Sequence, residues 1–300
     1  DVAGVFAPGG PLTRALPGFE ARAGQREMAR EVATVLAEGG VLLAEAGTGT
    51  GKTLAYLVPA ILSRHRVLVS TGTKNLQEQI FFKDLPVLRE SLGIPFSATY
   101  MKGRGNYLCL HRFADRRDNG IHSLDEAHYI RLIEEWRKTT DTGDRSEIEE
   151  LPFWNDISAS VENCIGSDCP QYHDCFVTRM RQRAAESDIV IVNHHLLCAD
   201  AAVRQNAYGE VIPSCDYVVV DEAHQLEDVA TQYFGISVSN YRIDDLARDI
   251  DKAVGARLIG DSDREHAIRH WVERLRDHAR AFFSGLQMVR FDTGSASIGL

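Results

Sequence analysis

A glycine-rich segment, AGTGTGKT at residues 46–53, constrains the fold of this 300-residue chain more than any other feature. It follows an apolar run, Val41 to Ala46, that predicts a buried strand, and it precedes a helical pattern from Thr53 to Leu62. Its three glycines let backbone amides turn inward, and the helix that begins near Lys52 adds the positive end of its dipole. This order is typical of a phosphate-binding loop, although Ala46 stands where the pattern normally has glycine.

The residue types of this loop predict a bound ATP with magnesium. We expect Lys52 to neutralise the β and γ phosphates and the Thr53 hydroxyl to coordinate Mg²⁺. Upstream, FEARAGQ at 19–25 could bind adenine, since an aromatic ring can stack on a base and Gln offers both a donor and an acceptor; an ordinary helix cap is the alternative. The predicted nucleotide-binding residues are Phe19, Arg22, Gln25, Ala46, Gly47, Thr48, Gly49, Thr50, Gly51, Lys52 and Thr53.

A second motif, VVVDEAH at 218–224, supplies acidic groups for the same site. Its apolar strand would deliver Asp221 to the sheet edge beside the loop, where a carboxylate can hold magnesium through water. Glu222 is the candidate base for the attacking water, and His224 is expected to link nucleotide state to neighbouring elements. The same four letters at 125–128 follow no strand, so we interpret that copy as a solvated helix face and expect a change of Glu126 to spare hydrolysis.

Alternating apolar runs and helical patterns predict an α/β fold with a doubly wound parallel sheet. The expected strands are Val41–Ala46, Val67–Ser70, Ser97–Met101, Ile189–Asn193 and Val218–Val220. The expected helices between them are Gln25–Leu36, Thr53–Leu62 and Lys74–Phe82. Residues 102–187 break the alternation and are interpreted as an insertion, and two amphipathic helical patterns follow Phe234.

Composition excludes some classes of protein. No apolar run approaches the ~20 residues of a membrane span, and the net charge of −10 argues against a wholly basic protein that coats nucleic acid. The start, DVAGVFAPGG, has neither an initiator Met nor a secretory signal, and the end has no recognisable closing element. We therefore expect a cytoplasmic protein and an N-terminal fragment.

Four cysteines, Cys109, Cys164, Cys169 and Cys175, lie between the two nucleotide motifs. Their spacing fits an iron–sulfur cluster better than zinc, because zinc ribbons pair cysteines two to four residues apart and Cys109 has no such near partner. Zinc remains the second interpretation and unligated thiols the third. The remaining two cysteines, at 198 and 215, are expected in the core.

Basic and aromatic residues surround these cysteines and predict a local groove for single-stranded DNA, with an ordinary charged surface as the alternative. The basic residues are Lys102, Arg104, Arg112, Arg116, Arg117, Arg179, Arg181 and Arg183.

Taken together, AGTGTGKT, STGTKNLQEQ at 70–79, the KGRGNYLC and CIGSDCPQYHDC cysteine segments, VNHHL at 192–196 and VVVDEAHQLEDVA resemble the DinG and XPD family of iron–sulfur helicases. The resemblance implies a RecA-like motor domain at 1–101 and 188–234, an inserted iron–sulfur domain at 102–187 and the start of a helical arch domain at 235–300. It implies a 4Fe–4S cluster and a DNA path near Thr71, Thr73, Lys74, Asn193 and His194.

The function implied by the resemblance is ATP-driven movement along single-stranded or forked DNA from the five-prime toward the three-prime end, by a monomer, in repair or replication. Nothing after Phe234 resembles a second motor domain, so we expect weak ATP hydrolysis from this chain alone. Two alternatives stay open: a nucleotide-gated, redox-sensing module that binds single-stranded DNA without unwinding, and a zinc-stabilised ATPase acting on other substrates.

Overall fold

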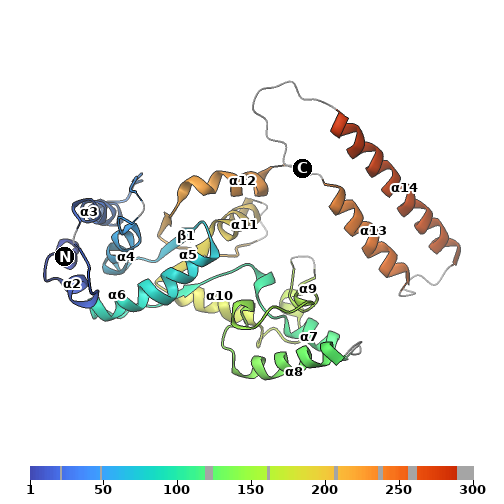
Figure 1. Cartoon of the computed structure of the whole chain (residues 1–300), viewed down its shortest axis with the longest axis horizontal. Helices are drawn as coiled ribbons and strands as arrows, with labels where there is room; N and C mark the ends of the chain where they lie inside the picture. The colour runs from blue at the N-terminus through green and yellow to red at the C-terminus, as the bar shows by residue number, and fades with distance from the viewer. Residues whose placement is uncertain are drawn as a thin grey trace. The chain divides into compact units, whose positions relative to one another are not determined.

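The computed structural model describes residues 1–20, 22–47, 49–118, 124–160, 163–205, 209–235, 239–255 and 262–288. The chain divides into two compact units, Asp1–Phe234 and Gly235–Leu300, which are drawn together in Figure 1. We describe each unit by itself.

A four-stranded sheet forms the centre of the first unit. Its strands are β1 (Val67–Thr71), β2 (Ala98–Tyr100), β3 (Ile189–Asn193) and β4 (Tyr217–Val220), and the spatial order is β2-β3-β1-β4 with every pair parallel. All residues of β1 and β3 are buried, as expected for parallel strands that are covered on both faces. The predicted α/β class and four of the five predicted strands are therefore present, and the arrangement fits a RecA-like fold.

The fifth predicted strand, Val41–Ala46, is absent. The described residues between 40 and 47 pair with no strand, and the side chains of Val41 and Leu43 are 89% and 93% exposed. At the edge of the sheet, β4 pairs only with β1 among the described strands, and Val218 in its middle is 53% exposed. The prediction was wrong because an apolar run becomes a strand only when its backbone pairs with a neighbouring strand, and this run stays unpaired although β4 has a free edge.

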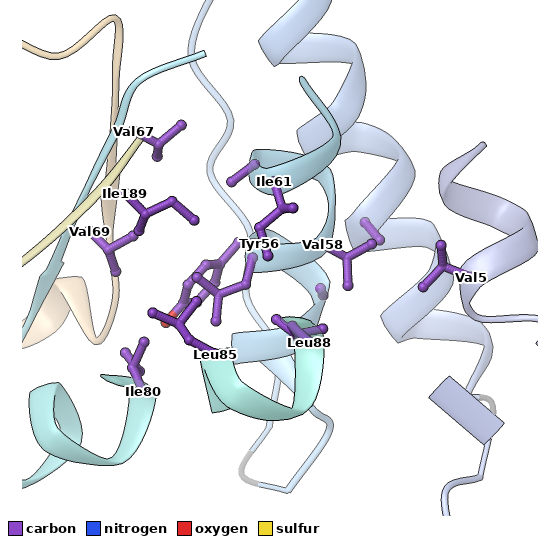
Figure 2. Packing of buried hydrophobic residues seen from close by; sticks show 14 of the residues in the cluster. Val5, Tyr56, Val58, Ile61, Val67, Val69, Ile80, Leu85, Leu88 and Ile189 are labelled. Carbon is purple, nitrogen blue, oxygen red and sulfur yellow. The ribbon is translucent and has the colours of Figure 1, made fainter. Parts of the chain in front are cut away.

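Helices α1 (Val2–Val5), α2 (Pro11–Ala15), α3 (Ala23–Glu38), α4 (Lys52–Ser63) and α6 (Leu85–Leu92) supply the first core cluster on one face of the sheet. In Figure 2, Tyr56 and Ile61 of α4 face Val67, Val69 and Ile189 of the sheet. Val58 lies on a different side of α4 and points toward Val5 (Figure 2). This apolar contact fixes α4, and hence the loop before it, against the strands.

Two short helical segments connect β1 to α6, which belongs to the first core cluster. These are α5 (Lys74–Gln79) and the π-helix η1 (Ile80–Asp84), which leads directly into α6. The Thr73 hydroxyl caps α5 by accepting a hydrogen bond from the Leu76 amide at 3.2 Å, so α5 begins immediately after β1 ends.

The opposite face of the sheet is covered by α10 (Phe176–Glu186) and α11 (His194–Gln205), followed in the chain by α12 (Leu226–Phe234). Leu68, Val190 and Val192 alternate with the residues of the first cluster and belong to a second one. The segment at 102–187 extends this second cluster with helices drawn in green in Figure 1. They are α7 (Leu110–Asp118), α8 (Leu124–Thr139) and α9 (Trp154–Ile157). The segment also contains the short helices η2 (Arg104–Asn106), η3 (Arg145–Glu147) and η4 (Gly166–Asp168), which add no residue to the cluster.

The described part of this segment contains no strand and only two isolated bridges, Tyr107 with Asp144 and Leu108 with Ser158. Its apolar residues join Leu68, Val190 and Val192 of the sheet in one cluster, so the segment packs as a continuation of the core of the first unit. The boundaries 102 and 187 remain a prediction.

The second unit contains α13 (Asn240–Gly255) and α14 (Ser262–Met288), which pack through buried Ala247, Val254 and Val272. Arg276 of α14 pairs with Asp251 of α13 at 2.9 Å. Among the helices described here, none combines the length and the apolar character needed to cross a membrane.

Candidate functional site

The glycine-rich loop leads into α4 through two left-handed residues. Gly49 has φ +75° and Gly51, the N-cap of α4, has φ +82°, conformations that favour glycine. A Cβ at Gly51 would also lie 2.1 Å from Nε2 of Gln25, so any other residue here would displace the Gln25 side chain. The Thr50 hydroxyl donates to the Gly47 carbonyl at 2.8 Å and closes the turn. Thr48, also predicted to bind nucleotide, lies outside the described residues.

Lys52 and Glu222, 170 positions apart, meet at the carboxyl ends of the strands. The Lys52 Nζ donates to Glu222 Oε1 at 2.9 Å, and both side chains are about one-quarter exposed, at 25% and 27%. Because α4 starts at Lys52 and β4 ends just before Asp221, the sheet brings the glycine-rich loop and the acidic motif to one place.

Asp221 is held beside this ion pair. Its amide donates to the Ser70 carbonyl at 2.8 Å, and its Oδ2 accepts a hydrogen bond from the Tyr56 hydroxyl at 3.3 Å. Burial raises the pKa of Asp221, and the neighbouring Glu222 raises it further. A divalent cation would favour the ionised form of such a crowded, poorly solvated carboxylate, so Asp221 and the Thr53 hydroxyl in the first turn of α4 are suitable magnesium ligands.

Glu222 has a left-handed backbone, with φ +54° and ψ +46°. Only one other non-glycine residue in the described ranges, Arg64, has positive φ. Such a conformation costs roughly 1 to 3 kcal/mol and is found preferentially at functional sites. His224 follows in η5 (Ala223–Gln225), where its Nδ1 lies 3.5 Å from Glu222 Oε2 while its side chain is 71% exposed. The proposed base is therefore strained and has His224 beside it.

Two of the three predicted adenine-binding residues contact the glycine-rich loop, and the third does not. Gln25 donates to the Gly51 carbonyl at 3.0 Å and Arg22 donates to the Gly49 carbonyl, so both contact the loop. They also line a pocket of about 460 Å³ together with residues 42–46, Thr50 and Lys52. Phe19 packs instead against the first core cluster and does not line this pocket.

The second DEAH sequence, at residues 125–128, is only partly exposed to solvent. In α8, Asp125 is exposed, but Glu126 is only 9% exposed and its Oε1 lies 2.7 Å from the Arg116 guanidinium. The predicted solvated face was therefore wrong for Glu126, because Arg116 of α7 provides a counter-ion that the local sequence does not reveal. This pair lies within residues 102–187, which the sequence predicts to be an insertion.

Four predicted DNA contacts are buried, namely Thr71, Lys102, Asn193 and His194. Thr71 and His194 have no exposed surface and Lys102 is 3% exposed, so none of the three offers surface for direct contact in this structure, and their place near a DNA path stays a prediction. His194 Nδ1 hydrogen-bonds the Ser70 hydroxyl at 2.7 Å, and burial lowers its pKa. Asn193, 7% exposed, accepts from the Leu196 amide at 2.9 Å.

The other predicted DNA contacts retain exposed surface. Thr73 and Lys74 are exposed at the start of α5, and Arg104 and Arg112 are partly exposed. Arg112 donates to the Asp156 carbonyl at 2.9 Å, so part of its guanidinium already has a protein partner.

The four cysteines of the predicted cluster come from four separate places. Cys109 precedes α7, Cys169 ends η4 and Cys175 caps α10, while Cys164 is exposed. Burial raises the pKa of the Cys109 thiol, and the nearby thiols of Cys175 and Cys169 raise it further. Among the described residues, no three acidic, His or Cys side chains converge closely enough to hold a single metal ion.

Arg181 is an unpredicted member of this region. Within the described ranges, its buried Nε has no hydrogen-bond partner. Burial lowers the pKa of its guanidinium and Arg104 lowers it further, while Cys164 and Cys175 oppose this effect. A partly buried cation near a second cation and two thiols is stabilised if those thiols carry negative charge, as thiolates bound to a cluster do.

Comparisons with known proteins agree with this site. Residues 25–104 match the family model described as DEAD/DEAH box helicase. The ATP-dependent DNA helicase YoaA of Escherichia coli is 43% identical over 285 residues, covering 92% of this chain and 44% of the relative. YoaA of Haemophilus influenzae is 41% identical, covering 84% and 40%, and the ATP-dependent helicase DinG of Mycobacterium tuberculosis is 35% identical, covering 79% and 39%.

The chain thus spans less than half the length of these curated relatives. The matches confirm the resemblance that the ordered motifs indicated. The chain belongs to the DEAD/DEAH box helicase family that includes YoaA and DinG.

Proposed function

We propose that this chain carries the ATP site of a DNA helicase that moves along single-stranded DNA from the five-prime toward the three-prime end. The observation that carries the proposal is the 2.9 Å contact between Lys52 of the glycine-rich loop and Glu222 of the acidic motif. Two groups that serve phosphate binding and water activation are adjacent, as ATP hydrolysis requires. Membership of a DNA helicase family supports DNA as the substrate.

The ion pair suggests an order of events. While Lys52 donates to Glu222, the ion pair occupies one oxygen of this carboxylate. Phosphate oxygens that enter the loop would compete for Lys52 and release Glu222. The freed carboxylate could then orient a water and accept its proton, and Asp221 and Thr53 would hold a magnesium ion, which would supply positive charge to the phosphates.

For the cysteines, we propose a 4Fe–4S cluster bound by Cys109, Cys164, Cys169 and Cys175. The crowding of the Cys109 thiol by two others and the unpartnered Nε of Arg181 support an anionic group here. Such a cluster spreads its ligands more widely than one ion does, which is compatible with the separated positions of the cysteines. Iron and acid-labile sulfide, lost in Cys109→Ser and kept in Cys198→Ser, would support the cluster; zinc without sulfide would contradict it.

For DNA, we propose that a single strand or a fork crosses the carboxyl edge of the sheet near Thr73, Lys74, Arg104 and Arg112, which keep exposed surface. Cationic and hydroxyl groups at this edge can contact phosphates without reading bases. A monomer acting in cytoplasmic DNA repair or replication completes the proposal.

The test is ATP hydrolysis by the complete protein with and without single-stranded DNA. We expect turnover that DNA stimulates and that Lys52→Ala abolishes. Asp125→Asn is the matched control, because Asp125 has the same sequence context as Asp221 but is exposed on α8. Turnover unaffected by DNA would contradict the proposal, and nucleotide-dependent DNA binding without strand separation would favour the redox-sensing alternative.

A further inference from the structure

Lys102 occupies the centre of a buried ionic network. Its Nζ lies 2.7 Å from Asp144 Oδ2 and 2.7 Å from Glu78 Oε1, and it donates to the Ser146 hydroxyl at 3.2 Å. The side chains of Lys102 and Asp144 are 3% and 1% exposed. One buried cation with two carboxylates and a hydroxyl is well compensated, and removing any central member leaves a buried charge unpaired.

The network joins three parts of the chain. Glu78 belongs to α5, Lys102 follows β2, and Asp144 lies between α8 and η3 in the predicted insertion. Further contacts hold Asp144 and the Lys102 backbone: the Tyr100 hydroxyl donates to Asp144 Oδ2 at 3.3 Å, and the Lys102 amide donates to the Tyr107 hydroxyl at 3.0 Å. The start of the insertion is therefore fixed to the sheet and to α5 together.

One face of α5 makes three polar contacts with this segment. Lys74, Gln77 and Glu78 are spaced i, i+3 and i+4, which places them side by side on a helix. The Lys74 Nζ donates to Asn106 Oδ1 at 2.7 Å. Buried Gln77 donates to the carbonyls of Met101 at 2.7 Å and Ile191 at 2.9 Å. This face of α5 therefore contacts both the segment at 101–106 and β3.

The turn between β1 and α5 lies beside Gln225, the residue that follows the acidic motif. The Gln225 side chain occupies the space beside Gly72, where an added Cβ would lie 2.1 Å from Gln225 Oε1. The backbone amide of Gln225 in turn donates a hydrogen bond to the Glu222 carbonyl at 2.9 Å. A change in the backbone of Glu222 would therefore move Gln225 relative to Gly72, in the turn that leads into α5.

We propose that α5 couples the nucleotide site to the cysteine-bearing insertion, with Lys102 as the positioning residue that transmits movement of α5 to the segment at 102–107. Release of Glu222 from Lys52 would shift Gln225 against Gly72, and the Lys74, Gln77 and Glu78 face would carry that shift to the loop before Cys109. This inference rests on the proposed function, because it requires nucleotide to bind at Lys52.

Glu78→Ala is the informative variant. Lys102→Met would leave Asp144 buried without a counter-ion and could prevent folding, whereas Glu78 is 34% exposed and its removal leaves the Lys102–Asp144 pair intact. Backbone hydrogen exchange of the full chain is measured with and without Mg²⁺ and a slowly hydrolysed ATP analogue. Glu90→Ala, at an exposed position of α6, is the matched control, and Glu78→Gln restores an oxygen acceptor for Lys102.

In the wild type and in Glu90→Ala, we expect the analogue to change exchange several-fold both at the loop 46–53 and at 102–107. In Glu78→Ala, the analogue should bind with unchanged affinity and still protect the loop, while the response at 102–107 is lost and Glu78→Gln recovers most of it. An unchanged response at 102–107 in Glu78→Ala would refute the coupling, as would loss of the response at both places, which would indicate a merely structural role.

The same experiment separates this inference from the function on which it rests. Failure of the wild type to bind the analogue would refute the nucleotide site and the coupling together. Binding with a response confined to the loop would refute the coupling alone.

Discussion

Asp84 is predicted to destabilise the folded chain at neutral pH. It is the last residue of the π-helix η1, and its Oδ2 is buried without a hydrogen-bond partner among the described residues. Burial raises the pKa of Asp84 to about 6 from an ordinary value of 3.8, against a smaller opposing effect of Lys83. A shift of about two pKa units corresponds to about 3 kcal/mol, and partial solvent access reduces the expected effect to about 1 to 2 kcal/mol.

The sign of the pH dependence follows from the raised pKa. Between pH 3.8 and about 6 the folded state holds this proton more tightly than the unfolded state, so the contribution of Asp84 to stability falls as the pH rises through that window. Above pH 6 both states are ionised and the full penalty remains. Asp84→Asn is uncharged at every pH, so it should raise the free energy of unfolding by about 1 to 2 kcal/mol at pH 8 and by little near pH 4.

Urea unfolding of the wild type and Asp84→Asn from pH 4 to pH 8 measures this difference. Asp115→Asn, whose side chain is 59% exposed, is the control and should change stability little at any pH. A gain for Asp84→Asn that is equal at pH 4 and pH 8, or a loss at pH 8, would refute the assignment of a buried, unpartnered carboxylate.

Three further predictions concern other sites. Gly143→Ala should destabilise the chain by more than about 1 kcal/mol in urea unfolding, because φ is +65° and the new Cβ would lie 2.4 Å from the Phe176 ring, whereas Gly9→Ala at φ +74° meets no atom within 4 Å and should cost less. Glu222→Gln should bind Mg-ATP at least as tightly as the wild type, since Lys52 loses its ion pair, while hydrolysis falls roughly a hundredfold to ten-thousandfold; weaker binding would argue against the competing ion pair. Arg181→Gln should release iron to a chelator faster than Arg179→Gln, because Arg179 is 44% exposed and already paired with Asp174; equal rates would contradict a role for Arg181 beside the cluster.

The local sequence predicts those elements whose residues carry their own structural signal. The apolar runs at β1 and β3 are long and β-branched enough to identify buried strands, and the glycines at 49 and 51 identify a left-handed loop. The run at Val41–Ala46 looks the same in sequence but has no ladder partner among the described strands. Apolarity indicates a preference for burial and does not supply the neighbour.

Residue roles that depend on distant partners were less predictable. Lys102 and Arg104 look alike in KGRG, but Asp144, 42 positions later, makes Lys102 an internal ion. In the same way, Arg116 buries Glu126, and Ser70 holds His194 inside the fold. The left-handed backbone of Glu222 has no signal in the sequence, since glutamate does not favour that conformation.

Mg-ATP binding tests most directly the claim that the loop at 46–53 and the motif at 218–224 form one site. A fluorescent ATP analogue would be titrated into the wild type, Lys52→Ala and Asp221→Asn, with and without Mg²⁺. We predict one saturable site per chain, lost in Lys52→Ala, with a Mg²⁺ dependence that Asp221→Asn removes. Equal binding by Lys52→Ala, or a Mg²⁺ dependence that Asp221→Asn leaves unchanged, would contradict the account.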